Sequence, residues 1–518
     1  MRRIFNVAGP CNPQQHYMID AYRRLGPEVS ALIADAQYFI IHAARQSGKT
    51  TLLLDLTLRI SAKADYYVLY CSLETLQGIS DPKDGIPSIV SALAHALRVF
   101  DLPQAAAFKQ GLDLSDYTNV LKDALTTYCR SLNKPLVIFF DEADCLSGQT
   151  LINFLRQLRS GYVTRSVAPF VHSLALVGLR NIRDYRDEYR PPNQSLGTAS
   201  PFNISKRALT LRNFTFDEIT ELYAQHTADT GQVFQDDAVD LVWDQTQGQP
   251  WLVNAIACDI VEATPPEVPI TVEMVSNAIH AIVTRRDSHF DSLMARLREE
   301  RVRRIIEPVI TGEKAGLNSL SDDYSYVKDL GLIRDDRRRV EPANPIYGDI
   351  IVRSLNWPTQ TVLSEENLPY QLPRCMKGGA IDMDYLLRDF QAFWRENGAI
   401  WKERYDYKEA AGQLVLQAFL QRVLNGGGRI TREMAAETGR ADLCVEYEGK
   451  RYPIELKIRY SSKTLREGIE QLGRYMDTLG CERGWLVLFD QRKGMSWPKK
   501  LYARTKKAGG KVIRVYGA

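Results

Sequence analysis

Four short apolar runs, separated by segments of helical periodicity, dominate the first part of the chain. The runs cover residues 38–41, 66–71, 136–140 and 174–179. Apolar strands that alternate with helices are typical of a parallel sheet with helices packed on both faces. The pattern therefore predicts an α/β fold, with a parallel-sheet domain over residues 1–212.

The periodicity becomes helical from residue 213 onward. Thr215 precedes the helical pattern that starts at Phe216, and its hydroxyl is suited to cap that helix. A second helix is expected from Asp236, and residues 272–310 predict one or two long helices rich in arginine. We expect these helices to form a lid over residues 213–295.

The next segments combine a helix with a charged hairpin and then return to a mixed pattern. Residues 326–333 end in Leu-Gly-Leu-Ile, and the basic run 337–339 follows, which suggests a winged-helix-like domain over residues 296–355. A linker and a helix are expected over residues 356–404. Residues 405–518 follow the order helix, three strands, helix, strand, and predict a second α/β domain.

Composition and charge narrow the class of protein without deciding its function. The 518 residues are 45% hydrophobic and 25% charged, as in ordinary folded proteins, and the net charge of +3 is compatible with a polyanionic partner. The 8 cysteines are scattered singly with no CxxC pair, which argues against zinc or disulfides and favours a cytoplasmic protein. The first residues lack the apolar core of a signal peptide, and no apolar run is long enough to span a bilayer, so we expect no membrane partner.

A phosphate-binding loop is indicated directly after the first apolar run. Residues 43–50 match the pattern G-x-x-x-x-G-K-[ST], except that Ala43 replaces the first glycine. In such a loop the backbone N–H groups face the anion, Lys49 reaches the β- and γ-phosphates of ATP, and Thr50 ligates Mg²⁺. A surface turn is the open alternative. The nucleotide-binding candidates here are Ala44, Arg45, Gln46, Ser47, Gly48, Lys49, Thr50 and Thr51.

Two acidic residues end the third apolar run. Residues 136–140 lead straight into Asp141 and Glu142, and ligands of open α/β sheets bind where the strands end. Asp141 is therefore placed to hold Mg²⁺ together with Thr50, and Glu142 to polarise the water that attacks the γ-phosphate. An acidic loop cap is the competing interpretation, and the order and spacing of the motifs favour the ATP site.

Two further positions fit a nucleotide site less uniquely. Arg180 follows the fourth apolar run, where it could contact the γ-phosphate or be a solvated loop arginine. Pro250 lies in Gly-Gln-Pro-Trp between two helices of the expected lid, where it could pack on adenine or form a simple turn.

These motifs resemble the AAA-like and STAND-type P-loop ATPases of bacteria and archaea over residues 1–350. The resemblance is carried by residues 5–11, 16–18, 42–50, 140–142, 200–204, 248–251 and 285–289. It implies that Arg180 and Pro250 contact the nucleotide. It also implies a switch, in which the nucleotide sets the conformation of an attached effector.

Three charged residues of the C-terminal domain are expected to converge on a hairpin. Asp442 begins one strand, and Glu455 and Lys457 lie two apart on the returning strand, so they share a face. Two carboxylates and a lysine suit metal-dependent phosphodiester hydrolysis, because hard oxygen atoms bind Mg²⁺ and the metal activates water. An exposed cross-strand ion pair is the open alternative.

Residues of two helices could complete this site. Glu409 in the preceding helix could be a further acidic ligand, and Gln471 and Tyr475, four apart on the following helix, could brace the metal face or contact the phosphate. A solvated helix face explains Glu409 and Gln471 equally well. All 7 histidines lie at or before His289, so this domain cannot use a histidine base or ligand.

The C-terminal arrangement resembles the PD-(D/E)XK nucleases over residues 405–518. Asp442, Glu455 and Lys457 match the motif, while Gly-Arg-Ala at residues 439–441 replaces its proline. The resemblance implies that Glu409 and Gln471 belong to the catalytic site. The implied ligands of Mg²⁺ or Mn²⁺ are Asp442, Glu455 and Leu456.

These patterns together predict an ATP-binding and ATP-hydrolysing protein that controls a C-terminal Mg²⁺-dependent DNA endonuclease. The basic clusters at residues 301–304, 337–339 and 499–511 suit phosphate binding, although each could equally be a solvated face. The resemblances imply a role in defence against foreign DNA or in DNA processing. Open alternatives are a STAND-type switch whose nuclease-like domain binds without cutting, and a DNA motor or loader. DNA is the expected partner, and a homo-oligomer is left open.

Overall fold

The computed structural model covers the 518-residue chain and describes most of it. The described residues are 3–178, 204–285, 288–311, 321–336, 339–351, 354–355, 375–377, 380–404, 412, 415–417, 419–420, 428–432, 443–459, 463–490 and 496–518. The chain forms two compact units, the first of residues 1–282 and 325–332 and the second of residues 283–324 and 333–518. Within the described parts, no helix combines the length and the apolarity that crossing a membrane requires.

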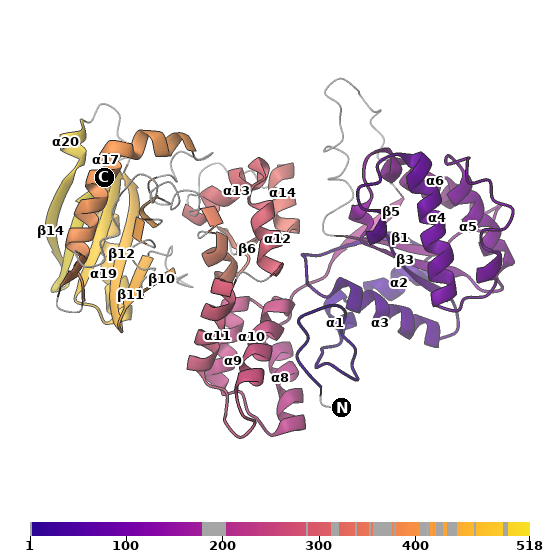
Figure 1. The fold of residues 1–518 in the computed structure, drawn as a ribbon, viewed down its shortest axis with the longest axis horizontal. Helices are drawn as coiled ribbons and strands as arrows, with labels where there is room; N and C mark the ends of the chain where they lie inside the picture. Colours follow the sequence, from indigo (N-terminus) through magenta and orange to yellow (C-terminus); the bar gives the residue numbers. More distant parts are fainter. Residues whose placement is uncertain are drawn as a thin grey trace. The chain divides into compact units, whose positions relative to one another are not determined.

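A parallel sheet of five strands forms the centre of the first unit (Figure 1). Its strands are β1 (Tyr38–His42), β2 (Tyr67–Ser72), β3 (Leu136–Asp141), β4 (Ser173–Gly178) and β5 (Ser205–Thr210). They lie in the order β2-β3-β4-β1-β5, and all neighbouring pairs are parallel. Four of these strands coincide with the apolar runs, so the predicted α/β fold is confirmed for this unit.

The apolar pattern does not predict β5. This strand pairs only with β1 at the edge of the sheet, and most of its side chains are exposed or partly exposed. An edge strand buries few side chains, so it needs no apolar run in the sequence. Its Ser-Lys-Arg start therefore resembles an ordinary loop.

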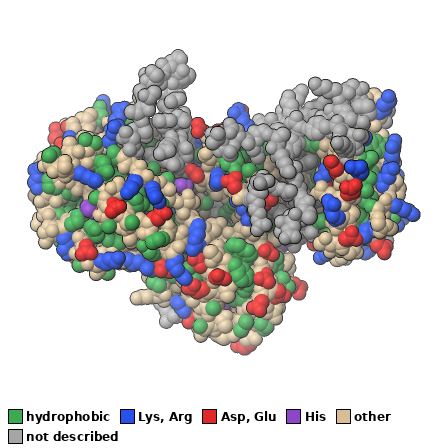
Figure 2. Space-filling model, turned by 180° about the vertical axis from the view of Figure 1, so that it is seen from behind, with side chains coloured by type: hydrophobic (Ala, Val, Ile, Leu, Met, Phe, Trp, Pro, Cys, Tyr) green, Lys and Arg blue, Asp and Glu red, His purple; other side chains and the backbone are tan. Residues whose placement is uncertain are grey.

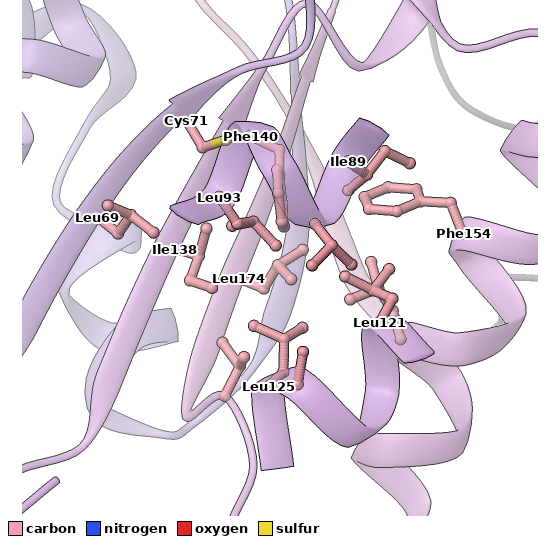
Figure 3. Close-up of a cluster of buried hydrophobic side chains, with 14 of the residues drawn as sticks. Leu69, Cys71, Ile89, Leu93, Leu121, Leu125, Ile138, Phe140, Phe154 and Leu174 are labelled. Carbon is pink, nitrogen blue, oxygen red and sulfur yellow. The ribbon is translucent and has the colours of Figure 1, made fainter. Parts of the chain in front are cut away.

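Helices cover both faces of the sheet (Figure 1). One face carries α1 (Ala21–Leu25), α2 (Glu28–Ala34) and α3 (Lys49–Ala62), and the other carries α4 (Pro82–Val99), α5 (Val120–Ser131) and α6 (Gly148–Thr164). On the second face, strand side chains interdigitate with helix side chains (Figure 3). Ten labelled members of this core are Leu69, Cys71, Ile89, Leu93, Leu121, Leu125, Ile138, Phe140, Phe154 and Leu174. All are at most 1% exposed, so the strand ends that carry the candidate site stand on a tightly packed support.

Four helices follow the sheet, as the periodicity predicts. They are α8 (Phe216–Thr230), α9 (Asp236–Thr246), α10 (Pro250–Ala263) and α11 (Val272–Arg285). Thr215 caps α8 in a reciprocal capping box with Glu218, which confirms the predicted start of that helix. The helical stretch at 272–310 was expected to hold one or two helices. The structure instead has three helices there, because α11 is followed by α12 (Ser288–Arg296) and α13 (Glu300–Thr311).

A short helix and a hairpin follow, in the predicted order. The helix is α14 (Asp322–Asp329), and the antiparallel hairpin consists of β6 (Ile333–Asp336) and β7 (Arg339–Pro342). A winged-helix assignment goes beyond these elements and stays a prediction. Residues 325–332 group with the first unit, so this part of the chain contributes to both units.

The C-terminal domain is built on a mixed sheet of six strands. A small hairpin of β8 (Met376–Lys377) and β9 (Ala380–Ile381) and the long helix α17 (Met383–Arg404) precede it. The sheet contains β10 (Gly428–Arg432), β11 (Leu443–Tyr447), β12 (Lys450–Arg459), β13 (Arg483–Asp490), β14 (Tyr502–Ala508) and β15 (Lys511–Gly517). Among the described residues of this domain, two further helices are α19 (Lys463–Leu479) and α20 (Trp497–Lys500).

The strand order of this sheet is β10-β11-β12-β13-β15-β14. The strands β10, β11 and β12 are antiparallel, β12, β13 and β15 are parallel, and β14 returns antiparallel to β15. The sequence predicted one strand after the last long helix, whereas the structure has three. The strand β14 gives no apolar signal because it is a polar, exposed edge strand, whereas the missed β15 is largely buried.

Candidate nucleotide site and candidate metal site

The predicted phosphate-binding loop connects β1 to α3. The loop needs backbone with positive φ at Gln46 (φ 56°) and Gly48 (φ 86°), and Gly48 tolerates this because it has no Cβ. Lys49 begins α3 and is 6% exposed. Its Nζ donates to the backbone oxygen atoms of Ala43 and Ala44, both at 3.3 Å. Burial lowers the pKa of Lys49, and the nearby carboxylates oppose that effect.

Thr50 and Asp141 meet at the ends of α3 and β3. The hydroxyl of Thr50 donates to Oδ2 of Asp141 at 2.8 Å, and Tyr70 Oη on β2 donates to the same oxygen at 3.1 Å. The other oxygen of Asp141 accepts the N–H of Glu142 at 3.0 Å. The predicted pair of Mg²⁺-ligating oxygen atoms is therefore brought together by the fold.

Glu142 takes a left-handed backbone conformation (φ 53°) directly after β3. Burial raises the pKa of Glu142 to about 6, and Lys49 opposes the rise. A half-buried carboxylate that lies near Lys49 is chemically suited to accept a proton from water. The role expected from the sequence, polarising the attacking water, stays a prediction for Glu142.

The donor atoms of this site fit a magnesium nucleotide. A hydroxyl and a carboxylate are the hard oxygen ligands that Mg²⁺ prefers, with substrate phosphates and water in its remaining positions. Thr50 and Asp141 would hold the ion, which would neutralise charge on the β- and γ-phosphates. Among the described residues, no group of three or more His, Cys, Asp and Glu side chains is arranged to hold a metal.

Two of the remaining loop candidates, Ser47 and Thr51, form hydrogen bonds within the protein. Ser47 Oγ donates to the Ala44 oxygen at 2.7 Å, and Thr51 Oγ1 accepts the N–H of Cys11 at 3.0 Å. Gln46 has a buried Oε1 without a hydrogen-bond partner. The contacts of Ala44, Arg45, Gln46, Ser47 and Thr51 with a nucleotide stay predictions.

Pro250 is the first residue of α10 and is buried. The preceding Gly248 (φ 71°) lies against the backbone of Phe214, whose N–H donates to the Gly248 oxygen at 2.9 Å. The predicted lid turn is therefore packed on the connection between β5 and α8. A contact between Pro250 and adenine stays a prediction, and Arg180 lies outside the described residues.

Glu455 and Lys457 lie on the same face of β12, as the alternation predicts. Lys457 Nζ lies 2.5 Å from Glu455 Oε1 and donates to Gln471 Oε1 on α19 at 2.9 Å. The intervening Leu456 points its side chain to the opposite face, so only its backbone could face a metal held there. Three of the predicted residues of the metal site are thus close together.

The Glu455 carboxylate is fully buried, and neither of its oxygen atoms accepts a hydrogen bond of good geometry. Burial raises the pKa of Glu455 to about 7, and the Lys457 ammonium group opposes the rise. Buried carboxylates are costly unless a cation and hydrogen bonds compensate them. The exposed ion pair that the sequence left open is therefore wrong for Glu455. Asp442 and Glu409 lie outside the described residues.

Comparisons with known proteins are more informative about the candidate nucleotide site than about the candidate metal site. A family model described as an AAA-like domain matches residues 29–351, which is more than half of the chain. The chain belongs to the AAA-like domain family. A second model, described as a domain of unknown function, DUF8371, matches residues 388–493. A search of curated proteins finds no match.

Solved structures similar to this AAA-like protein include a Walker-type ATPase, an Orc1 protein and a Cdc6p. A Walker-type ATPase of Pyrococcus abyssi is 13% identical, covering 67% of this chain and 99% of that protein, with a TM-score of 0.46. The Orc1 protein of Aeropyrum pernix in complex with DNA is 15% identical, covering 66% and 93%, with a TM-score of 0.32. Cdc6p of Pyrobaculum aerophilum is 14% identical, covering 65% and 93%, with a TM-score of 0.36.

Two residues near the AAA-like nucleotide site are not found by reasoning from the sequence. Tyr70 reaches Asp141 because β2 lies beside β3 in the sheet. Arg24 on α1 donates to the Ser47 oxygen in the phosphate-binding loop at 2.7 Å. Neither belongs to a motif, and both depend on which strands and helices become neighbours.

Proposed function

We propose that this AAA-like protein binds and hydrolyses ATP at residues 43–50 with Asp141 and Glu142, and that the nucleotide state controls Mg²⁺-dependent DNA cleavage by the C-terminal domain. The ATPase part is supported by the family and by the Thr50–Asp141 contact of 2.8 Å. Lys49 would bind the terminal phosphates, and Glu142 would orient and deprotonate the attacking water.

The nuclease part is supported by one observation above all. Glu455 is a fully buried carboxylate with the Lys457 ammonium group at 2.5 Å, and neither of its oxygen atoms accepts a hydrogen bond of good geometry among the described residues. An under-coordinated buried carboxylate beside a lysine is suited to share a divalent cation with further acidic ligands. Asp442 directly precedes β11, the strand paired with β12, and we propose it as the second acidic ligand. Such an ion would supply an activated water and stabilise the leaving oxygen.

Within this proposal, Lys457 and Gln471 have separate tasks. The Lys457 ammonium group would offset the negative charge that develops on the scissile phosphate while water attacks it. Gln471 would hold that ammonium group in place, because its Oε1 accepts from Lys457 Nζ at 2.9 Å. The DNA backbone would lie along basic side chains of the same domain.

A basic edge offers such a contact surface. The exposed residues of the edge strand β14 include Arg504, Lys506 and Lys507, and Lys499 is exposed in α20. Figure 2 shows lysine and arginine side chains along this rim of the C-terminal domain. Lysines on an edge strand also prevent pairing with other chains, so the strand has a structural use even without DNA. Phosphate contacts here would weaken steeply as salt increases.

The experiment that tests the proposal measures DNA cleavage and ATP turnover in the same preparation. Purified protein is incubated with plasmid and linear DNA, with Mg²⁺ or Mn²⁺, and with or without ATP. We expect Glu455→Gln to abolish cleavage and keep ATP turnover, while Lys49→Ala abolishes turnover and removes the effect of ATP on cleavage. Matched controls are Glu446→Gln, a partly exposed carboxylate on β11 that pairs with Arg451, and Lys63→Ala at the exposed end of α3.

The outcomes separate the competing functions. Cleavage that persists in Glu455→Gln rejects the nuclease site. DNA binding without cleavage by the native protein favours the second candidate, an ATP-dependent switch whose C-terminal domain binds without cutting. ATP turnover unchanged in Lys49→Ala rejects the nucleotide site itself.

A further inference from the structure

A buried arginine lies against the predicted phosphate-binding loop. Among the described residues no carboxylate forms a salt bridge with it, although the Glu218 carboxylate is near enough to favour its charge. Arg24 is 5% exposed, and its guanidinium group donates to two backbone carbonyl oxygen atoms. Nη2 donates to the Ser47 oxygen at 2.7 Å, while Nε and Nη2 donate to the Arg212 oxygen at 2.9 and 2.6 Å. Its plane lies over the ring of Phe214, with Cζ 4.9 Å from the ring centroid.

The desolvation cost of burying the Arg24 guanidinium group indicates that this side chain has a specific role. Burial lowers the pKa of Arg24 to about 10, which leaves it charged at neutral pH. Burying a charge is unfavourable unless hydrogen bonds compensate it, and here carbonyl groups of two separate segments do so. An apolar side chain at this position would avoid the cost of desolvation altogether. A guanidinium fork is the side chain that joins two carbonyl groups at once.

We propose that Arg24 is a positioning residue, which sets the orientation of the Ser47–Gly48 peptide for phosphate binding. It also connects that peptide to the segment between β5 and α8, where the helical lid begins. The peptide is planar and trans, so its C=O and N–H point to opposite sides. Because Arg24 holds the Ser47 oxygen, the N–H of Gly48 is turned away from Arg24. That N–H is one of the donors with which such loops hold phosphate.

The other end of the contact lies at the start of the lid. Arg212 follows β5, and its side chain pairs with Glu218 of α8 at 2.7 and 2.8 Å. The backbone N–H of Phe214 donates a hydrogen bond to the Gly248 oxygen. A rotation of the lid at this connection would move the Arg212 oxygen and strain its bonds to Arg24. Phosphate binding in the loop and movement of the lid are therefore coupled through the Arg24 side chain.

Gly48 provides independent support for this arrangement. A methyl group at Gly48 would lie 3.2 Å from Nη1 of Arg24, tighter than ordinary contact. The absence of a side chain at Gly48 thus serves the close approach of Arg24 as well as the positive φ angle.

The test compares Arg24→Met and Arg24→Lys with Arg23→Met in the full chain. Arg23 is the preceding residue of α1, and its side chain is half exposed and pairs with Glu221. Affinities for ATP, ADP and inorganic pyrophosphate are measured, along with the thermal midpoint without nucleotide. We expect Arg24→Met to weaken all three ligands by tenfold or more, about 1.4 kcal/mol. We expect Arg24→Lys to recover only part of that loss, and Arg23→Met to bind as the native protein does.

Amide hydrogen exchange provides a readout that a merely structural role would not change. In the native protein, pyrophosphate is expected to slow exchange at Gly48 and at residues 212–214. In Arg24→Lys, the slowing at 212–214 is expected to disappear. Native affinity in a folded Arg24→Met, full recovery by lysine, or an unchanged response at 212–214 would each overturn the proposal. If Arg24→Met does not fold, Arg24→Lys decides the question alone.

This inference rests on the proposed nucleotide site, and the two can fail separately. If the native protein does not bind ATP or pyrophosphate, the proposed function fails. If the native protein binds them, Lys49→Ala does not, and the Arg24 variants bind normally, only the role of Arg24 fails.

Discussion

At the proposed nucleotide site, different side chains are expected to serve nucleotide binding and ATP hydrolysis. Lys49 and Thr50 belong to the loop that would hold the phosphates, whereas Glu142 directly follows β3 at the same edge of the parallel sheet and has a raised pKa. A carboxylate whose pKa is near 6 is an effective proton acceptor at neutral pH, because it is ionised yet still basic. Removing it should therefore affect turnover much more than affinity.

Glu142→Gln should lower kcat for ATP hydrolysis by about 10²–10⁴-fold. The affinity for ATP should stay close to the native value, because the amide keeps the shape of the side chain and removes only its basicity. Phosphate release gives the rate, and equilibrium binding gives the affinity. The control is Glu74→Gln, an exposed carboxylate in the 3₁₀ turn that follows β2. A variant that hydrolyses ATP at the native rate would show that Glu142 is not the base.

A pH effect on stability follows from Glu455. Its pKa in the folded protein, about 7, is raised above the ordinary 4.5, so the folded chain binds more protons than the unfolded chain between these values. The stability contributed by the protonated carboxyl is complete below pH 4.5 and is lost as the pH rises through 7. Above that pH, burying the ionised Glu455 carboxylate lowers the free energy of unfolding by about 3 kcal/mol at most.

Glu455→Gln should therefore stabilise the C-terminal domain at pH 8 much more than at pH 5, compared with the native protein. Urea unfolding at both pH values measures this difference, with Glu446→Gln as the control. Mg²⁺ should restore stability to the native protein at pH 8 and not to Glu455→Gln. An equal effect of the substitution at both pH values contradicts the raised pKa.

Residues that act within one local motif were predictable, whereas those brought in by tertiary neighbours were not. The order of residues 136–142 alone predicts a buried strand that ends in two acids, and the structure confirms it. Tyr70 and Arg24 contact the same site, but their contacts depend on the order β2-β3 and on the packing of α1. No periodicity in a single sequence contains that information.

At the scale of secondary structure elements, the turn between α9 and α10 shows how the lid is fixed. Gly248 has a positive φ angle, and a Cβ there would lie 2.0 Å from the Phe214 oxygen. Gly231 at the end of α8 has a similar φ of 80° but no atom within 4 Å of a Cβ. The two glycines share the same backbone requirement and differ only in their surroundings.

Gly231→Ala should cost about 1–2 kcal/mol, the strain of a left-handed backbone with a side chain. Gly248→Ala should cost clearly more, because the connection between β5 and α8 must also move away. Urea unfolding of the two variants, measured side by side, tests the difference. Equal destabilisation would mean that the turn and the hinge are not packed as described.

Edge and connecting elements account for most of the fold that the sequence did not predict. The strands β5 and β14 were missed, because each pairs on one side only and exposes most of its side chains. The stretch at 272–310 is continuous in helical periodicity, yet it is divided into three helices. Apolar pattern predicts what is buried, and it says little about polar edges and helix breaks.

At the scale of the whole molecule, the first unit is assembled from two separate stretches of the chain. Residues 325–332 return to it after the chain has passed through the second unit. Within the first unit, His42 Nε2 lies 3.6 Å from Asp329 Oδ1, and a Cβ at Gly331 would lie 2.4 Å from the Cβ of Ala44 in the phosphate-binding loop. The returning segment therefore packs against the start of the nucleotide site.

A chain that ends at residue 282 should bind ATP at least tenfold more weakly than one that ends at residue 355, because it lacks the packing on His42 and Ala44. Equilibrium binding of ATP by the two purified chains measures the effect. Circular dichroism before binding serves as the control for folding. Equal affinity in two folded chains would show that residues 325–332 do not support the loop.

The same discontinuity constrains how the protein is made. During synthesis the amino-terminal part of a chain generally folds first, as it leaves the ribosome. Here the sheet and its covering helices can collapse once residue 282 has emerged, but the support behind Ala44 is complete only after residue 332 has followed. The nascent protein therefore passes through an interval with a formed sheet and an unfinished phosphate-binding loop. We therefore expect full affinity for nucleotide only after part of the neighbouring unit has been translated.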